Sequence, residues 1–305
     1  MSQPSIPASP ATAAWGSVAK GFLAAGGVVL IWTGFNIVSR MGGKSELTPF
    51  DLAAIRFGVS GSLLLPFALR RKFAATWLQL AVLAAFGGVG YGLQVYSGFS
   101  FAPASHAGIL VNGGIPFATA LLAWAALGYR PGRQALLGLV MAGSGIVLMG
   151  LWSLGGNFAG GRQWLGDTLF VGAAVSWAIF GLLMKRWHVR PLEATMGLAC
   201  FSMLAYLPVY LLFLPKGISA VSSHFLLLQC AYQGIAAPIV AGLLYAYANL
   251  SIGPMRASLM LALVPGLSAM AAVPLLGEPL SALTISGVLL VSLGAILASS
   301  APARR

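Results

Sequence analysis

The chain has 305 residues, of which 59% are hydrophobic and 7% are charged. A soluble domain carries about 25% charged residues, so this composition excludes a soluble globular protein. The formal net charge of +12 would suggest nucleic-acid binding in a soluble chain, but here the basic residues are spread over short loops between apolar runs and form no single patch. We therefore expect an all-α, polytopic membrane protein that contacts lipid and binds no nucleic acid.

Residues 1–17 contain three prolines and no charge, and we expect them to form a disordered cytoplasmic tail. Ten apolar segments follow, each close to the 20 residues or so that cross a bilayer as a helix. We predict ten transmembrane spans, numbered in chain order, at residues 18–39, 49–69, 76–99, 104–128, 133–152, 164–184, 191–214, 222–249, 255–276 and 280–299.

The basic residues predict the orientation of these spans. Of the 17 lysines and arginines, 12 fall on the side of the N-terminus, the other side receives Arg40, Lys44, Arg162 and Lys216, and the remaining one, Arg56, lies within a span. Because cytoplasmic loops carry the excess of positive charge, the N-terminus is predicted to be cytoplasmic. An even number of spans places the C-terminus on the same side, as in a bacterial inner (plasma) membrane protein.

Residues recur at nearly constant spacing along the chain. A shift of 145 residues superimposes Trp32 on Trp177, and a shift of 149 superimposes Pro116 on Pro265. The same two shifts also align Gly27, Phe35, Gly128, Gly138 and Gly145 with Gly172, Phe180, Gly277, Gly287 and Gly294. We predict two five-span repeats, at 18–152 and 164–300, joined by a periplasmic linker at 153–163. Since five is odd, the second repeat enters the membrane inverted, as in many secondary transporters.

Three stretches resemble a known family. They are "WTGFNIVSR" (32–40) in span 1, "PFDLAAIRF" (49–57) opening span 2, and "PLLGEPLSALTISGVLLVSLGAIL" (274–297) near the end. With the repeat, they make the chain similar to the EamA family of the drug/metabolite transporter superfamily, and most like its YddG-type exporters of aromatic amino acids. The first repeat departs, because "LGYRP" (127–131) lacks the acid of "LGEP". The resemblance implies export by alternating access between the repeats.

A polar face in span 1 is the first candidate for a binding site. Trp32 and Asn36 are four residues apart and share one helix face. Trp32 and its counterpart Trp177 lie too deep for the aromatic belt at the membrane edge. An asparagine in hydrocarbon is costly unless it is hydrogen-bonded, so we expect this face to line a central cavity. The alternative is helix–helix packing through the polar amide.

Spans 3 and 8 carry further polar and aromatic residues. Tyr91 and Gln94 follow helical spacing in span 3, and Gln233 and Tyr245 lie in span 8. Uncharged polar and aromatic side chains suit a ligand with both apolar and hydrogen-bonding parts. We assign these four residues to the substrate site, with ordinary packing as the alternative.

The run "NGGIP", which begins at Asn112, should loosen span 4, and backbone freed at membrane depth is tolerated where it lines a cavity. Asn112 is therefore a candidate substrate ligand, and Pro116, Pro238 and Pro265 are candidate hinges. The alternative is a kink that only fits neighbouring helices.

Arg56 is the charged residue that lies well inside a predicted span, seven residues after Pro49. Intramembrane charge is a functional-site hypothesis by default, which makes Arg56 a candidate gate or carboxylate contact. At about 10 Å from the helix start, however, the side chain could also snorkel to the outer surface in a structural role.

The five acids all lie at or near predicted span ends, and His106, at the start of span 4, is interpreted as a boundary residue. A proton-driven carrier usually needs a buried group to hold the proton. We therefore predict facilitated exchange or uniport. The two cysteines lack metal-site spacing, and we expect no metal and no cofactor.

The predicted function is export of aromatic or large neutral amino acids, or similar small amphipathic metabolites, by a monomeric carrier. A sugar-phosphate, nucleotide-sugar or drug carrier is an alternative, although phosphate would require more basic residues near the site. A non-transporting scaffold or receptor is an alternative of another class. An enzyme is not expected, because the spans offer no nucleophile with its base.

Overall fold

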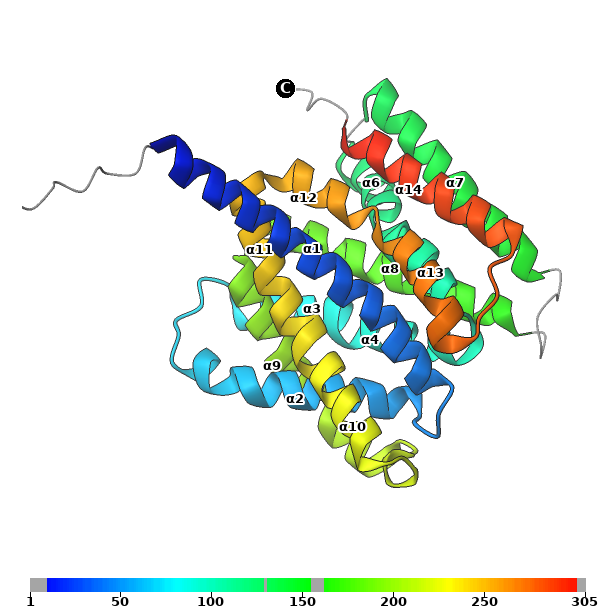
Figure 1. Cartoon of the computed structure of the whole chain (residues 1–305). Helices are drawn as coiled ribbons and strands as arrows, with labels where there is room; N and C mark the ends of the chain where they lie inside the picture. The colour runs from blue at the N-terminus through cyan, green and yellow to red at the C-terminus, as the bar shows by residue number, and fades with distance from the viewer. Residues whose placement is uncertain (1–9, 129–130, 155–161, 301–305) are drawn as a thin grey trace, which may run out of the picture.

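The computed structural model describes residues 10–128, 131–154 and 162–300, and every regular element in these ranges is helical (Figure 1). Residues 1–9 of the expected tail, 129–130 of "LGYRP" and 155–161 of the expected linker lie outside the described residues. The helices are α1 (Pro10–Gly43), α2 (Pro49–Leu69), α3 (Trp77–Leu83), η1 (Ala84–Gly90), α4 (Tyr91–Phe101), α5 (Ala104–Ala107), η2 (Gly108–Asn112), α6 (Gly114–Leu127), α7 (Arg133–Leu154), α8 (Gln163–Arg186), α9 (Pro191–Phe213), η3 (Ile218–Ala220), α10 (Ser223–Gln229), η4 (Cys230–Val240), α11 (Ala241–Ile252), α12 (Pro254–Leu261), α13 (Val264–Leu276) and α14 (Ala282–Ser299).

Ten helical segments of the described ranges are long and apolar enough to cross a membrane. They coincide with the ten predicted spans to within a few residues at each end, so the prediction of an all-α polytopic membrane protein is confirmed.

Two boundaries differ from the sequence prediction. α1 begins at Pro10, so residues 10–17, expected in the disordered tail, extend the first helix; the stretch is rich in alanine, which favours helix, and proline is tolerated in a first turn. Ser153 and Gln163, expected at the ends of the linker, lie in α7 and α8, where both are buried.

Irregular helix occurs at matching places in the two halves. Spans 3 and 8 each contain a π-helical segment, η1 and η4. Span 4 breaks at Gly113 after the π-helical η2, and span 9 breaks at residues 262–263 between α12 and α13. Departures from α geometry of this kind are common at functional sites. The predicted loosening around "NGGIP" is therefore present in the backbone.

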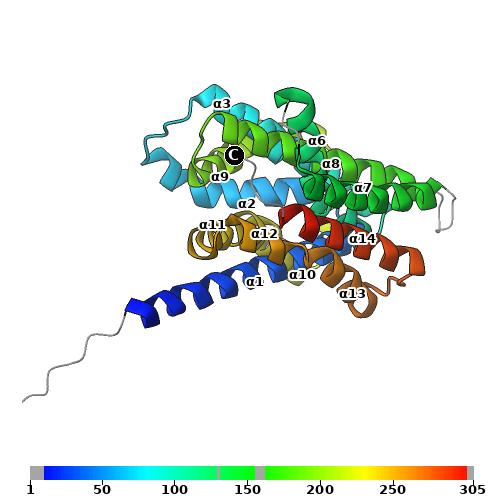
Figure 2. The same cartoon turned by 90° about the horizontal axis from the view of Figure 1, so that it is seen from above.

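Helix packing follows the same correspondence. α1 packs against α11 and α13, and α8 packs against α4 and α6, while α2 pairs with α9 and α7 pairs with α14. Figures 1 and 2 show α7 and α14 side by side at one edge. If each span of the first half is exchanged with the corresponding span of the second, the pairs of α1 become the pairs of α8, and the pairs α2–α9 and α7–α14 map onto themselves.

The recurring glycines have structural roles. Gly128 and Gly277 both adopt left-handed backbone, with φ of 65° and 66°, and end α6 and α13, a conformation that glycine adopts without steric cost. Gly138 on α7 and Gly294 on α14 lie against each other's backbone, where an added Cβ on either would clash with main-chain atoms. Small residues allow such close approach in membrane helices.

Candidate functional site

The side chain of Asn36 joins three spans. Asn36 is 1% exposed, and its amide nitrogen donates to Oδ1 of Asn112 at 3.0 Å and to Oγ of Ser268 at 2.9 Å. Asn112 is the last residue of η2 and Ser268 lies in α13, so both partners belong to the broken spans. The amide junction of Asn36, Asn112 and Ser268 therefore ties α1 to the two helix breaks.

Each of the two deep tryptophans lies beside a tyrosine of a neighbouring helix. The ring centroids of Trp32 and Tyr245 are 6.0 Å apart, and those of Tyr91 and Trp177 are 4.9 Å apart. These pairs connect α1 with α11 and α4 with α8. Each pair joins one helix of the first half to one helix of the second, and exchanging the halves converts one pair into the other. Both tryptophans are half-buried.

The two predicted glutamines lie in different surroundings. Nε2 of Gln94 donates to the Gly90 carbonyl at 2.9 Å and to Oγ of Ser176 at 2.8 Å, next to Trp177. Gln233 is fully buried, donates to Oγ of Ser39 at 3.0 Å and accepts from the Tyr96 hydroxyl at 2.9 Å. With its hydrogen bonds made inside the protein, Gln233 holds α1, α4 and η4 together.

The candidate hinge prolines also differ from one another. Pro265 is buried in the first turn of α13, against Gly108, and Pro238 lies within the π-helical η4. Pro116 is exposed on α6. Two of the three prolines thus lie at irregular helix, and Pro116 follows the break at Gly113 by one turn.

Arg56 points into the protein. The residue is 5% exposed, and its guanidinium carbon lies 5.7 Å from the ring centroid of Phe35 and 6.0 Å from that of Tyr91. The snorkelling considered above is therefore not the conformation found. Arg56 stands beside the Tyr91–Trp177 pair, in contact with aromatic rings from two other helices.

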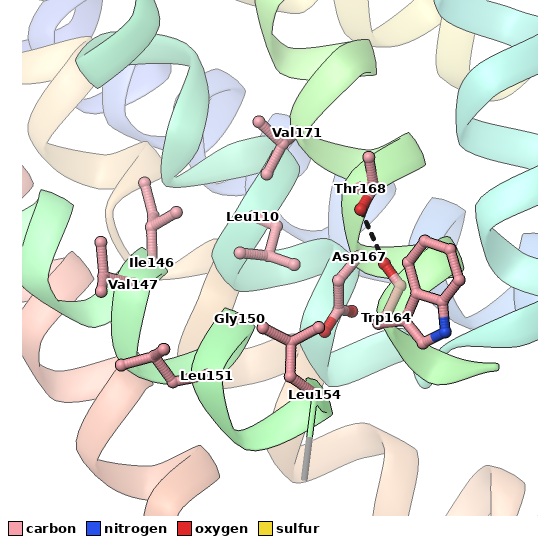
Figure 3. Close-up of a pocket in the computed structure, with 10 residues that line it drawn as sticks. All are labelled: Leu110, Ile146, Val147, Gly150, Leu151, Leu154, Trp164, Asp167, Thr168 and Val171. Atoms are coloured by element: carbon pink, nitrogen blue, oxygen red, sulfur yellow. Dashed lines mark hydrogen bonds between the residues drawn. The ribbon is translucent and has the colours of Figure 1, made fainter. Parts of the chain in front are cut away.

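A pocket of about 360 Å³ opens between α7 and α8, beneath η2 (Figure 3). Its lining is mostly apolar, and several lining side chains, including Leu151 and Leu154, are exposed, so it is a lateral groove on the outside of the helix bundle. None of the predicted substrate residues lines this pocket. Its lining residues are Leu110, Ile146, Val147, Gly150, Leu151, Leu154, Trp164, Asp167, Thr168 and Val171.

The carboxylate of Asp167, drawn in Figure 3, belongs to a buried polar cluster. Asp167 accepts from the His106 ring nitrogen Nδ1 at 2.8 Å and from the Ser153 hydroxyl, and Gln163 donates to Ser153 at 3.0 Å. His106 is 2% exposed, and as the third residue of its span it lies at a span boundary but inside the protein. The i, i+4 spacing of Gln163 and Asp167 was a signal for a shared polar face, but their partners come from other spans.

Two acids give a structural role to the stretches "LGEP" and "PFDLAAIRF". Glu278 of "LGEP" accepts from Nε of Arg40 at 2.7 Å and from the backbone N–H of Ala104 at 2.9 Å. The end of span 1 is thereby fixed to the loop before span 10. Asp51 of "PFDLAAIRF" caps α2 with Thr48 and accepts from the Tyr210 hydroxyl at 2.5 Å.

Ten apolar spans around a buried amide junction and paired aromatic residues define the class of a polytopic membrane protein. Residues 19–151 and 164–300 each match the EamA-like transporter family, so the chain belongs to this family. It is therefore a multi-pass membrane transporter of the drug/metabolite type.

Similarity to individual proteins is more distant. A probable amino-acid metabolite efflux pump of Salmonella typhimurium is 28% identical over 290 residues, which cover 88% of this chain and 90% of that protein. An uncharacterized transporter of Archaeoglobus fulgidus is 28% identical over 182 residues, 57% of this chain and 61% of that protein. One crystal structure superposes with a TM-score of 0.62 at 21% identity, covering 92% of this chain and 96% of the other, and this likeness concerns the fold alone.

Proposed function

We propose that the protein exports amino acids with large apolar or aromatic side chains, or similar small amphipathic metabolites, across the inner membrane. The observation that carries the proposal is the amide junction at the two helix breaks, where Asn36 and Asn112 meet. Broken helices offer free backbone groups to a polar ligand at membrane depth. The similarity to the Salmonella typhimurium efflux pump supports the same substrate class.

The proposed substrate site lies between the halves. The tyrosine–tryptophan pairs Trp32–Tyr245 and Tyr91–Trp177 supply flat apolar surfaces with a polar edge, and Asn36, Asn112 and Gln94 supply hydrogen-bonding groups. In this proposal Gln233 does not touch the substrate but holds α1, α4 and η4 together beside the site through its buried hydrogen bonds. Pro238, Pro265 and Pro116 lie at the segments that bend.

Alternating access is proposed to move one five-span half, residues 18–152, against the other, residues 164–300. Exchange of the halves preserves the packing pairs α1–α11 and α4–α8, and the family match divides the chain in the same way. Because five spans make up each half, the halves are inserted in opposite orientations, with both termini cytoplasmic.

Transport is proposed to be facilitative. The buried carboxylate of Asp167 is the fifth residue of α8, about 6 Å along the axis from the helix start, and it is already held by His106 and Ser153. A carboxylate that lies near a span end and is held in this way suits a structural role.

A counterflow screen tests the proposal. The purified protein is reconstituted in vesicles loaded with one unlabelled compound from a panel of amino acids and sugar phosphates, and uptake of the labelled compound is followed. Large neutral or aromatic amino acids should exchange and sugar phosphates should not. Exchange of sugar phosphates alone would replace the proposal with the phosphate-carrier alternative.

A further inference from the structure

We propose that Arg56 binds the carboxylate of the transported molecule, and that this carboxylate is required for recognition whereas an ammonium group is dispensable. The inference rests on the proposed function, because it concerns the same site. It defines the substrate class as monocarboxylates on an apolar or aromatic body, with amino acids as one member.

The guanidinium of Arg56 lies beside the Tyr96 hydroxyl and two aromatic rings and has no charged partner among the described residues. The side chain is 5% exposed, and its Nε has no hydrogen-bond partner among the described residues. Phe35 and Tyr91 offer their ring faces, and each such contact contributes about 0.5–2 kcal/mol. Removing a charge from water costs several kcal/mol, even after relaxation, and ring faces leave N–H donors unpaired.

The nearest acid along the sequence is already occupied. Asp51 precedes Arg56 by five residues on α2, and its carboxylate accepts from the Thr48 backbone N–H and hydroxyl, the Gly217 backbone N–H and the Tyr210 hydroxyl. These donors satisfy both of its oxygens. Asp51 is in neither of the ion pairs found in the described part of the chain.

The other four acids of the chain are also accounted for. Glu278 pairs with Arg40, Asp167 pairs with His106, Glu193 accepts from the backbone N–H groups of Ala74 and Ala75, and Glu46 is exposed. The chain has five acidic residues in all, so no carboxylate of its own pairs with Arg56. In this proposal the negative charge comes from a bound molecule.

The surroundings of Arg56 indicate what kind of anion fits. Phosphate recognition generally draws on several basic or backbone donors, whereas Arg40, near the end of span 1, is engaged by Glu278. One planar guanidinium matches one carboxylate. The adjoining Tyr91–Trp177 pair supplies an aromatic surface for the rest of the molecule.

The ammonium group of an amino-acid substrate would need an acidic partner in the site, and the five acids of the chain do not supply one. Four acids are engaged and Glu46 is exposed in the loop between spans 1 and 2, so no buried carboxylate is free to receive it. A monocarboxylate also neutralises the charge of Arg56, whereas a zwitterion leaves a net positive charge at a buried site, which is unfavourable.

The test compares ligands that differ in one group. Thermal unfolding of the purified full chain is measured with 3-phenylpropanoate and with 3-phenylpropanamide, for the wild type and for Arg56→Gln, Arg56→Lys and Arg71→Gln. Arg71 lies in an exposed loop, so Arg71→Gln removes the same charge elsewhere. In the wild type and in Arg71→Gln, the carboxylate should stabilise at concentrations at least tenfold lower than the amide, and this difference should vanish in Arg56→Gln.

Counterflow of labelled L-phenylalanine separates this inference from the proposed function. Unlabelled L-phenylalanine and 3-phenylpropanoate should compete, and phenethylamine and L-phenylalaninamide should compete at least tenfold more weakly. If phenylalanine exchanges but amine and amide compete equally, the inference is wrong and the proposed function stands. If no amino acid exchanges, the proposed function is wrong, and the unfolding comparison decides the inference.

Two further outcomes are decisive. If Arg56→Gln does not fold, Arg56→Lys and the wild-type ligand series carry the test, and the lysine variant should weaken carboxylate binding while leaving amide binding unchanged. If stability responds to chloride and carboxylate and amide act alike, Arg56 holds a chloride ion and the inference is overturned.

Discussion

The amide nitrogen of Asn36 on α1 donates a hydrogen bond to Oδ1 of Asn112, 3.0 Å away, at the end of the π-helical η2. The same nitrogen donates to Ser268 of α13. One side chain of span 1 thus connects the two spans whose helices are broken. Any movement of these spans relative to α1 must break or exchange these hydrogen bonds.

Replacing Asn36 with alanine should reduce transport at least tenfold. The change removes both hydrogen bonds of the amide junction and leaves the Asn112 side chain short of a donor, a loss of about 1–3 kcal/mol per buried group. Counterflow per amount of folded protein is the measurement. Asn249→Ala is the matched control, because the Asn249 amide donates to the Tyr245 carbonyl of its own helix; equal effects of the two changes would remove the special role of Asn36.

The contact between Gly138 and Gly294 predicts a clear difference between two glycines of α7. An added methyl group on Gly138 meets main-chain atoms of α14, whereas nothing lies within 4 Å of one on Gly150. Gly138→Ala should destabilise the protein by about 1–3 kcal/mol through overpacking. Gly150→Ala should be neutral or slightly stabilising, since alanine favours helix. Thermal unfolding in detergent checks both, and similar melting temperatures would contradict the packing of α7 on α14.

The ion pair between Arg40 and Glu278 should stabilise the fold without setting the substrate. Both side chains are largely buried, and each makes a further hydrogen bond to a backbone group of the segment around the loop between spans 3 and 4. Glu278→Gln should cost about 1.5–3 kcal/mol, as expected for a hydrogen bond to a charged group. A double-mutant cycle with Arg40→Gln measures the coupling; a coupling near zero would show that the pair contributes nothing.

Collapsing the pH gradient should leave transport unchanged when a substrate gradient is present. The buried Asp167 is engaged by His106 and Ser153 near the end of its span. Asp167→Asn should therefore lower thermal stability while the substrate gradient still drives exchange. Uptake that requires a pH gradient in the wild type, and loses that requirement in Asp167→Asn, would instead make the Asp167–His106 pair a proton-coupling site.

The spans could be predicted from the sequence because a helix that crosses a bilayer needs a continuous apolar run, which is a local property. The break in span 4 was equally local, since "NGGIP" weakens a helix wherever it occurs. Asn36 and Asn112 were each identified as unusual for the same reason.

The partners could not be predicted in this way. Asn36 and Asn112 are 76 residues apart, Arg40 and Glu278 are 238 apart, and His106 and Asp167 are 61 apart. Only the packing of the spans brings such residues together. For this reason the sequence did not identify Asp167 as the partner of His106, and it left open whether Arg56 snorkels or points into the protein, where it is found buried.

The most direct measurement is counterflow of a labelled aromatic amino acid with Trp32→Ala and Trp177→Ala, one tryptophan from each half. Trp124→Ala, which removes an indole that is 55% exposed on the outer surface, is the control. If the two halves enclose a shared substrate site, both changes should reduce exchange at least tenfold while the control stays close to the wild type. Unchanged exchange in both variants would contradict the account.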